Sequence, residues 1–346
     1  MKYFLLITIA IFCTAMFPAS DGASQEPNWV IYNTTNSDLP QNYILSMGID
    51  NKNNKWLGTL TGLVKFDGKK WIVYDKKSKK DIQYSTVRSI VIDSEDKLWT
   101  GTWGDGMAQL VFPDGNPDNP NAAYKWIYYR NNNSAMPHNT VKTVCVDNDG
   151  NKWIGTEDGM VSMVNAGWGV GGLKWKAYYK YNSGLPHDAV YSIVVDEFNN
   201  KWIGTFGGGL AKYDGLNWTV YDIRNSPLPD NFIITMVMDK KQTVWMGTYS
   251  GGLASYDGTK WNVYKTSNSD IPDNVVYAMA VDEQNNLWIG TLQGLARFDG
   301  AKWTKYDLMN SGKPYTVSSI VIDKYNNKWI GTGEGLAVFN ETGIKK

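Results

Sequence analysis

The stretch Lys201-Trp202-Ile203-Gly204-Thr205 decides the fold, because near copies of its last four residues recur along the whole chain. The tryptophan of this motif stands at seven positions: Trp56, Trp99, Trp153, Trp202, Trp245, Trp288 and Trp329. Successive copies are 41 to 54 residues apart, a spacing that is typical of the four-stranded blades of a β-propeller. The sequence therefore predicts an all-β fold, a seven-bladed β-propeller.

Each repeat contains four short β-rich runs, which we call a, b, c and d in chain order. In the best-preserved repeat they are Ala189–Asp196, Lys201–Thr205, Gly209–Tyr213 and Trp218–Asp222. Run a ends at an aspartate in every repeat: Asp50, Asp93, Asp147, Asp196, Asp239, Asp282 and Asp323. Because Asx side chains bond to the local backbone in turns, we interpret these aspartates as turn residues. Residues 147–151 resemble half of a calcium loop but lack its remaining ligands, so we predict no metal and no cofactor.

The two ends of the chain complement each other. Residues 28–33 are a d run without its own blade, and the last repeat stops after run c at Gly335–Asn340. A blade left open there would expose unpaired backbone groups, which natural sheets cover or pair. We therefore expect residues 28–33 to form the outer strand of the seventh blade, so that one N-terminal and three C-terminal strands close the ring. Residues 23–346 then form a single propeller domain.

The repeat also locates its own irregularities. Blades 2 and 3 carry extra residues between runs c and d, around Pro113–Tyr124 and Asn165–Lys174. Fourteen of the sixteen tryptophans belong to two series that follow the repeat, and the remaining two are Trp103 and Trp168. Trp168 lies in the blade 3 insertion, whereas Trp103 lies in a b–c loop, on the opposite face of a propeller.

Residues 1–22 have the pattern of a secretory signal peptide, since Lys2 precedes an apolar run that ends at Phe17 before small and polar residues. This run is too short for a transmembrane helix, and we expect no membrane insertion after signal removal. The predicted location is periplasmic or extracellular. The chain contains 34 basic and 34 acidic residues, a balance that argues against a nucleic-acid partner. Cys145, in a run a, is expected to be a small core residue.

Several segments resemble a known family. The stretches Asn199–Thr205, Gly209–Gly215 and Leu228–Asn231 look like two-component regulator propeller repeats, and the resemblance extends over nearly all of the chain after residue 22. In that family such blades build the extracytoplasmic sensor regions of hybrid histidine kinases, many of them in Bacteroidetes, where the propellers recognise oligosaccharides. The present sequence stops at Lys346 without a transmembrane helix, kinase or receiver. The resemblance therefore implies a free ligand-binding or interaction propeller, able to partner a separate membrane protein.

Departures from the repeat point to candidate binding residues over blades 2 to 4. The only two histidines, His138 and His187, occupy the same repeat position in adjacent blades. We expect them near one another at the mouth of the central channel, a suitable place to hold an anion, a metal or a hydroxylated ligand. Arg88, Lys142 and Tyr191 each lie five places before a run-a aspartate, and we expect them close by. At that place blades 1 and 5 have Leu45 and Ile234.

Trp103 is a further candidate binding residue. We align it with small or polar residues of the other b–c loops: Thr61, Asp158, Gly207, Ser250, Gln293 and Glu334. A spare exposed tryptophan suits stacking on a sugar ring. The predicted polar pocket comprises Arg88, Trp103, His138, Lys142, Glu157, His187 and Tyr191. The alternative interpretation is that these are ordinary solvated loop residues.

Three functions remain open at the level of sequence. We favour a binding or sensor-like module without catalysis, which recognises a small polar or carbohydrate ligand or a protein partner. Neither a Ser-His-Asp arrangement, a nucleophile elbow nor a zinc motif is legible in the sequence. The first alternative is a propeller enzyme, streptogramin-lyase-like or glycan-cleaving, because a pair of carboxylates cannot be located from sequence. The second alternative is a pure protein-interaction scaffold.

Overall fold

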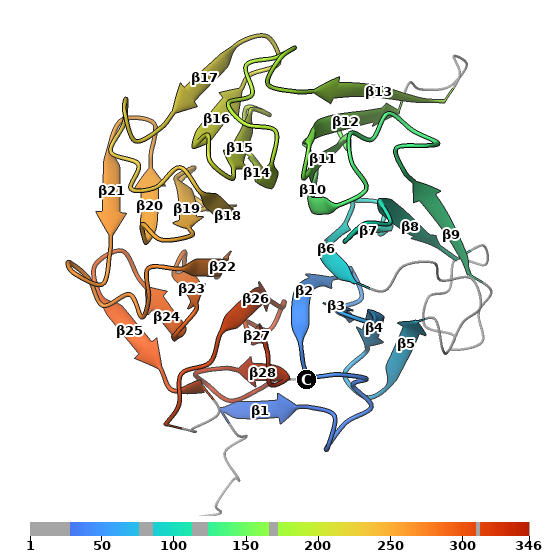
Figure 1. Cartoon of the computed structure of the whole chain (residues 1–346). Coiled ribbons are helices and arrows are strands. Elements are labelled where there is room, and N and C mark those ends of the chain that lie inside the picture. The colour runs from blue at the N-terminus through green and yellow to red at the C-terminus, as the bar shows by residue number, and fades with distance from the viewer. Residues whose placement is uncertain (1–27, 76–85, 113–123, 166–171, 309–311, 346) are drawn as a thin grey trace, which may run out of the picture.

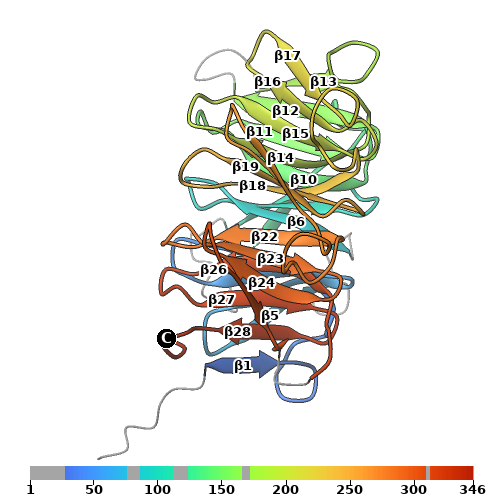
Figure 2. The same ribbon diagram turned by 90° about the vertical axis from the view of Figure 1, so that its left-hand side faces the viewer.

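The computed structural model describes residues 28–75, 86–112, 124–165, 172–308 and 312–345. It contains seven four-stranded sheets set around a central axis, as Figure 1 shows. Figure 2 shows the ring edge-on, with β1 lying beside β28. The prediction of an all-β seven-bladed propeller is thus confirmed. The expectations for residues 1–22, for Trp168 and for most of the two insertions concern residues outside the described ranges.

Each blade is an antiparallel sheet whose strands a, b, c and d follow one another from the axis outwards. Blades 1 and 2 consist of β2 (Ile44–Ile49), β3 (Lys55–Thr59), β4 (Gly62–Phe66), β5 (Trp71–Asp75), and of β6 (Val87–Ile92), β7 (Leu98–Thr102), β8 (Met107–Val111), β9 (Lys125–Tyr129). Blades 3 and 4 consist of β10 (Val141–Val146), β11 (Lys152–Thr156), β12 (Gly159–Asn165), β13 (Leu173–Tyr178), and of β14 (Val190–Val195), β15 (Lys201–Thr205), β16 (Leu210–Tyr213), β17 (Trp218–Tyr221). Blades 5 and 6 consist of β18 (Ile233–Met238), β19 (Val244–Thr248), β20 (Leu253–Tyr256), β21 (Trp261–Tyr264), and of β22 (Val276–Val281), β23 (Leu287–Thr291), β24 (Gly294–Phe298), β25 (Trp303–Tyr306).

The seventh blade joins the two ends of the chain. It consists of β26 (Val317–Ile322), β27 (Lys328–Thr332), β28 (Leu336–Phe339) and, on the outside, β1 (Trp29–Tyr32). β1 pairs with β28 in antiparallel register, from Trp29 opposite Phe339 to Tyr32 opposite Leu336. The predicted closure by one N-terminal and three C-terminal strands is confirmed. Because β1 pairs with β28, the backbone groups of β28 are not left unpaired.

In blade 4, each of the four residues Trp202 to Thr205 of the recurring motif has its own structural role. The indole Nε1 of Trp202 donates to Asp196 Oδ2 at 3.0 Å, and Ile203 is fully buried. A Cβ on Gly204 would lie 2.6 Å from Ile233 Cγ2 of the next blade, so only glycine allows the two blades to approach this closely. The hydroxyl of Thr205 donates to the Gly209 carbonyl at 2.8 Å and holds the b–c loop.

The run-a aspartates do more than shape turns. In all seven blades the carboxylate accepts the indole N–H of the tryptophan six residues later, at 2.9 to 3.1 Å. Its other oxygen accepts backbone N–H groups of the a–b turn, as Asp196 does from Phe198 and Asn200. The predicted turn role is confirmed, and the same side chain also ties strand a to strand b.

Lysines at the start of strand b extend this tie to the preceding blade. Lys201 Nζ lies 3.2 Å from Asp147 Oδ2 and 4.9 Å from the ring centre of Trp153, both in blade 3. Lys152 and Lys55 make the equivalent contacts with blades 2 and 7. Burial would raise the pKa of Asp147, but hydrogen bonds from Trp153 and Asn151 and the charge of Lys201 outweigh it and lower the pKa. These buried pairs therefore stabilise the joints between blades as long as the carboxylates are ionised.

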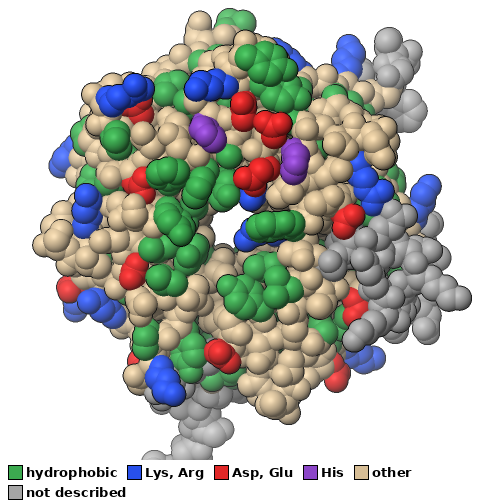
Figure 3. Space-filling view, in the orientation of Figure 1, with side chains coloured by type: hydrophobic (Ala, Val, Ile, Leu, Met, Phe, Trp, Pro, Cys, Tyr) green, Lys and Arg blue, Asp and Glu red, His purple; other side chains and the backbone are tan. Residues whose placement is uncertain are grey.

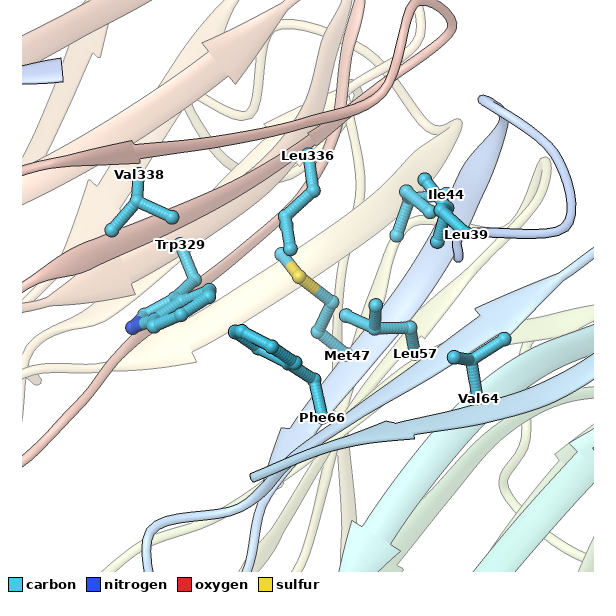
Figure 4. Packing of buried hydrophobic residues seen from close by; sticks show 9 residues of the cluster. All are labelled: Leu39, Ile44, Met47, Leu57, Val64, Phe66, Trp329, Leu336 and Val338. Atoms are coloured by element: carbon cyan, nitrogen blue, oxygen red, sulfur yellow. The ribbon is translucent and has the colours of Figure 1, made fainter. Parts of the chain in front are cut away.

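The hydrophobic core is divided among the joints between neighbouring blades. At the joint that closes the ring, Phe66 and Met47 of blade 1 pack against Trp329 and Val338 of blade 7 (Figure 4). Phe66 and Trp329 meet edge to face with ring centres 6.0 Å apart. Each blade thus buries its apolar faces against its two neighbours, as expected for stacked repeats.

Every innermost strand contains a β-bulge at the same place. In β10, for example, the pairing with β11 shifts between Val141 and Thr143, which leaves Lys142 as the extra residue. The same shift occurs in the other six blades. A bulge turns its extra residue out of the regular alternation of a strand. The seven bulge residues are Leu45, Arg88, Lys142, Tyr191, Ile234, Tyr277 and Ser318.

Candidate functional site: a central pocket

The seven bulge residues all line one pocket at the centre of the ring, with a volume of about 490 Å³. The remaining lining residues come from the loops of the same face: Tyr43, Trp103, Phe206, Tyr249, Leu292 and Thr316. Figure 3 looks onto the molecule in the orientation of Figure 1 and shows hydrophobic side chains around the central opening. The pocket is therefore built from every blade, and the local bulge directs one side chain of each blade into it.

One wall of the pocket is cationic and comes from blades 2 and 3. The guanidinium carbon of Arg88 lies 4.4 Å from the ring centre of Trp103, within the range of a cation–π contact. Lys142 Nζ lies 4.8 Å from the same ring and 4.6 Å from that of Tyr191, and it forms an ion pair with Glu157. Five of the seven residues predicted from the sequence thus form one connected group.

The two histidines do not line this pocket, and each has a local partner. His138 Nδ1 accepts the backbone N–H of Thr140 at 3.0 Å, and His187 Nδ1 accepts that of Ala189 at 3.1 Å. Asp230 caps the equivalent turn of blade 5 by accepting from Phe232 at 3.0 Å. The shared repeat position of the histidines, which suggested a joint ligand site, therefore has an explanation in turn capping.

The wall that adjoins it is aromatic, and of its residues only Tyr191 was predicted. Tyr191 stacks on Phe206 with ring centres 4.7 Å apart, and Phe206 meets Tyr249 edge to face at 5.9 Å. Tyr277 of blade 6 and Tyr43 of blade 1 continue this wall. Trp103 and Tyr249 have half of their surface exposed, at 55% and 50%. Large, partly exposed aromatic faces of this kind are suited to contact the flat faces of a ligand.

The aromatic wall was missed because the b–c loops were aligned one residue out of step. The backbone N–H of Trp103 donates to the Thr86 carbonyl, and Tyr249 and Phe206 make the equivalent bonds to Phe232 and Ala189. Trp103 therefore corresponds to these residues: Leu60, Glu157, Phe206, Tyr249, Leu292 and Gly333. The alignment of Trp103 with Thr61, Asp158, Gly207, Ser250, Gln293 and Glu334 is wrong. Trp103 is one member of a mostly apolar ring rather than a lone exception.

Other reactive groups of the described residues lie apart from the pocket. Cys145 is partly buried and packs against the core between blades 3 and 4, so its expected core role is met in part. Burial raises the pKa of its thiol to about 12 and keeps it protonated. Within the described ranges, His, Cys, Asp and Glu side chains do not gather in groups of three able to hold a metal ion. In the same ranges there is also no helix with the length and apolar character needed to cross a membrane.

Comparisons with known proteins agree with this architecture. Residues 227–250 and 270–293 match the family described as two component regulator propeller. The fold is similar to the extracellular domain of a hybrid two-component system of B. thetaiotaomicron, with a TM-score of 0.76 and 22% identity over 91% of this chain and 41% of that one. An extracellular domain of a one-component system of the same bacterium gives a TM-score of 0.68 and 20% identity over 91% and 40%.

A third similar structure belongs to an enzyme. A catalytically inactive virginiamycin B lyase from Staphylococcus aureus, solved with quinupristin, gives a TM-score of 0.68 and 13% identity over 90% of this chain and 98% of that one. A comparison with curated protein sequences found no match. The chain spans about two fifths of the extracellular signalling domains that it resembles. It therefore carries two-component regulator propeller repeats on a seven-bladed fold shared with those domains, which confirms the resemblance predicted from its sequence.

Proposed function

We propose that this chain is an extracytoplasmic, sensor-like binding module that takes a small carbohydrate into the central pocket. The observation that carries the proposal is the convergence of seven bulge residues, one from each blade, on a single pocket of about 490 Å³. That volume lies in the range of small-ligand sites. Six aromatic side chains of the pocket offer ring faces. The hydroxyls of Ser318 and Thr316 donate to backbone carbonyls, so their oxygens remain as acceptors for a polar ligand.

Two further observations support this role. The pattern of residues 1–22 predicts export, and the similar signalling domains are extracellular. The site side chains are also variable between blades, whereas the residues that join the blades are repeated. Variation confined to one surface of a repeat protein is typical of its binding face.

The experiment is a glycan array with the folded protein, followed by calorimetric titration of each glycan that binds. Trp103→Ala and Tyr249→Ala should each weaken binding about threefold to tenfold, because one aromatic stacking contact contributes about 0.5–1.5 kcal/mol. Phe198→Ala is the matched control, since Phe198 is an exposed aromatic residue on an a–b turn of the opposite face. Its affinity should equal that of the unchanged protein.

Two results would contradict the proposal. If no glycan bound, while a protein partner co-purified with both the unchanged chain and the Trp103→Ala variant, the chain would be an interaction scaffold. If product analysis of a bound glycan showed new chain ends or an unsaturated sugar, the module would be an enzyme. Binding without turnover, weakened by the two pocket variants and not by Phe198→Ala, supports the proposed function.

A further inference from the structure

Arg88 is the unbalanced charge of the central pocket. Lys142 is paired with Glu157, so these two charges compensate each other. No carboxylate of the described ranges lies within ion-pair distance of the Arg88 guanidinium, whose contact there is the face of Trp103. Apart from Arg88 and Lys142, the side chains that line the pocket are uncharged. The wall formed by blades 2 and 3 therefore carries one excess positive charge.

The position of Arg88 makes this charge available to a ligand. The bulge in β6 between Val87 and Ser89 directs the side chain into the pocket instead of into the joint between blades. Trp103 covers one side of the guanidinium, and burial lowers the pKa of Arg88 from its ordinary value. An arginine remains ionised under such conditions. A partly desolvated guanidinium with free N–H groups gains more from an incoming anion than a fully hydrated one does.

We infer that the saccharide bound in this pocket is acidic, with a single carboxylate that binds Arg88 while its sugar ring lies against the aromatic side chains. This inference rests on the proposed function and specifies its ligand class. The planar fork of a guanidinium matches the two oxygens of a carboxylate. One excess positive charge matches one carboxylate. Glu157, which contributes to the electrostatic environment of Arg88, disfavours a second negative charge nearby.

The aromatic side chains place the sugar ring relative to the acid group. Trp103 stands at the cationic wall, and Tyr191 links that wall to Phe206 and Tyr249. A hexuronic acid carries its carboxylate directly on the sugar ring, so the two groups of the ligand are a few bond lengths apart. A pocket in which the cation and the ring faces adjoin one another fits this spacing.

The test compares acidic saccharides with their own uncharged forms. Disaccharides that contain one residue of glucuronate, galacturonate or mannuronate beside a neutral sugar are titrated by calorimetry, each next to its methyl ester, which keeps the shape and removes the charge. We expect at least one uronate to bind about tenfold more tightly than its ester, because charge-assisted hydrogen bonds are stronger than neutral ones. Arg88→Gln should abolish this preference, so that each uronate and its ester bind with similar affinity. Arg88→Lys should restore part of the preference.

A second variant should increase the preference for the uronate over its ester. Glu157→Gln removes the partner of Lys142 and so adds a positive charge to the pocket. It should raise uronate affinity about threefold or more without changing the affinity for the ester. Thermal melts of each variant show whether the blades remain intact. Because one variant weakens and the other strengthens acid binding, a general loss of folding cannot produce the expected pair of results.

The outcomes separate this inference from the proposed function. If neutral saccharides bound in the pocket as tightly as the uronates, and Arg88→Gln left both unchanged, the ligand class would be wrong and the binding function would stand. If sulfated saccharides bound more tightly than every uronate, the choice of carboxylate would be overturned. If neither acidic nor neutral saccharides bound, the proposed function itself would fail.

Discussion

Two positions on neighbouring strands of each blade follow opposite rules. The third residue of the recurring motif is glycine in all seven blades: Gly58, Gly101, Gly155, Gly204, Gly247, Gly290 and Gly331. The bulge position beside it holds leucine, arginine, lysine, tyrosine twice, isoleucine and serine. A Cβ on Gly155 would lie 2.6 Å from Val190 Cγ1 of the next blade, whereas the bulge side chains face the central pocket. Repetition thus marks the joints between blades, and variation marks the binding surface.

Both regions contain a tryptophan, so the same substitution can be made in each. Trp288 is fully buried and bonded to Asp282 at 3.0 Å, whereas Trp103 is 55% exposed at the pocket. Trp288→Ala should lower the free energy of unfolding by about 3–5 kcal/mol, as large-to-small core substitutions do. Trp103→Ala should change it by less than about 0.5 kcal/mol. Urea unfolding followed by circular dichroism measures both.

The measurement compares the loss of unfolding free energy in Trp288→Ala with the loss in Trp103→Ala. Equal losses of stability would mean that Trp103 is part of the scaffold and that the pocket is not separable from it. If Trp288→Ala unfolded with the free energy of the unchanged protein, the hydrogen bond between the indole and Asp282 would contribute little to the stability of the joint. Either result would contradict the conclusion that repeated residues stabilise the joints while variable residues form the pocket.

The sequence predicted the joints well because they obey a period. The blade count, the closing strand at residues 28–33 and the turn role of the aspartates all follow from counting positions between equivalent residues. The bond from Trp202 to Asp196 was not predicted, although a spacing of six residues repeats in every blade. A spacing alone does not show that two side chains point toward one another across an a–b turn.

The pocket was predicted only in part, because its geometry depends on an irregularity. Arg88, Lys142 and Tyr191 were found as departures from the repeat, and their placement together follows from equivalent positions in adjacent blades. The bulge that aims them into the pocket has no residue signature, since leucine, lysine and serine all occupy it. The off-by-one alignment of Trp103 hid Phe206 and Tyr249. The histidines drew attention because they are rare, while their role resembles that of Asp230 in an ordinary turn.

Lys201 carries the buried positive charge at the joint between blades 3 and 4. Lys201→Met should lower the free energy of unfolding by about 1.5–3 kcal/mol, the range of a hydrogen bond to a charged group. Leu98, Val244 and Leu287 occupy the same place in blades 2, 5 and 6, so an apolar residue is compatible with the joint. Urea unfolding at neutral pH gives the difference. An unchanged midpoint would show that the pair with Asp147 does not stabilise the ring.

The same pairs predict the acid sensitivity of the fold. Hydrogen bonds and charge lower the pKa of Asp93, Asp147 and Asp323 below the ordinary value of 3.8, against the opposing effect of burial. The unfolded chain therefore binds protons more readily than the folded protein does. This stability is complete well above the ordinary pKa and is lost as the pH falls through the lowered folded values. Unfolding midpoints should drop between about pH 5 and about pH 2, and less steeply in Lys201→Met.

Two adjacent isoleucines of β18 test the bulge itself. Ile234 is the bulge residue of blade 5 and lines the pocket, while its neighbour Ile233 is fully buried against Gly204 of blade 4. Ile234→Thr should cost less than about 1 kcal/mol, because its side chain lies outside the joints. Ile233→Thr should cost about 2 kcal/mol or more, since it buries a hydroxyl without a partner and leaves a gap. If the two adjacent substitutions were equally destabilising, the bulge would not separate pocket from scaffold, and the variable ring would have to be counted among the joints.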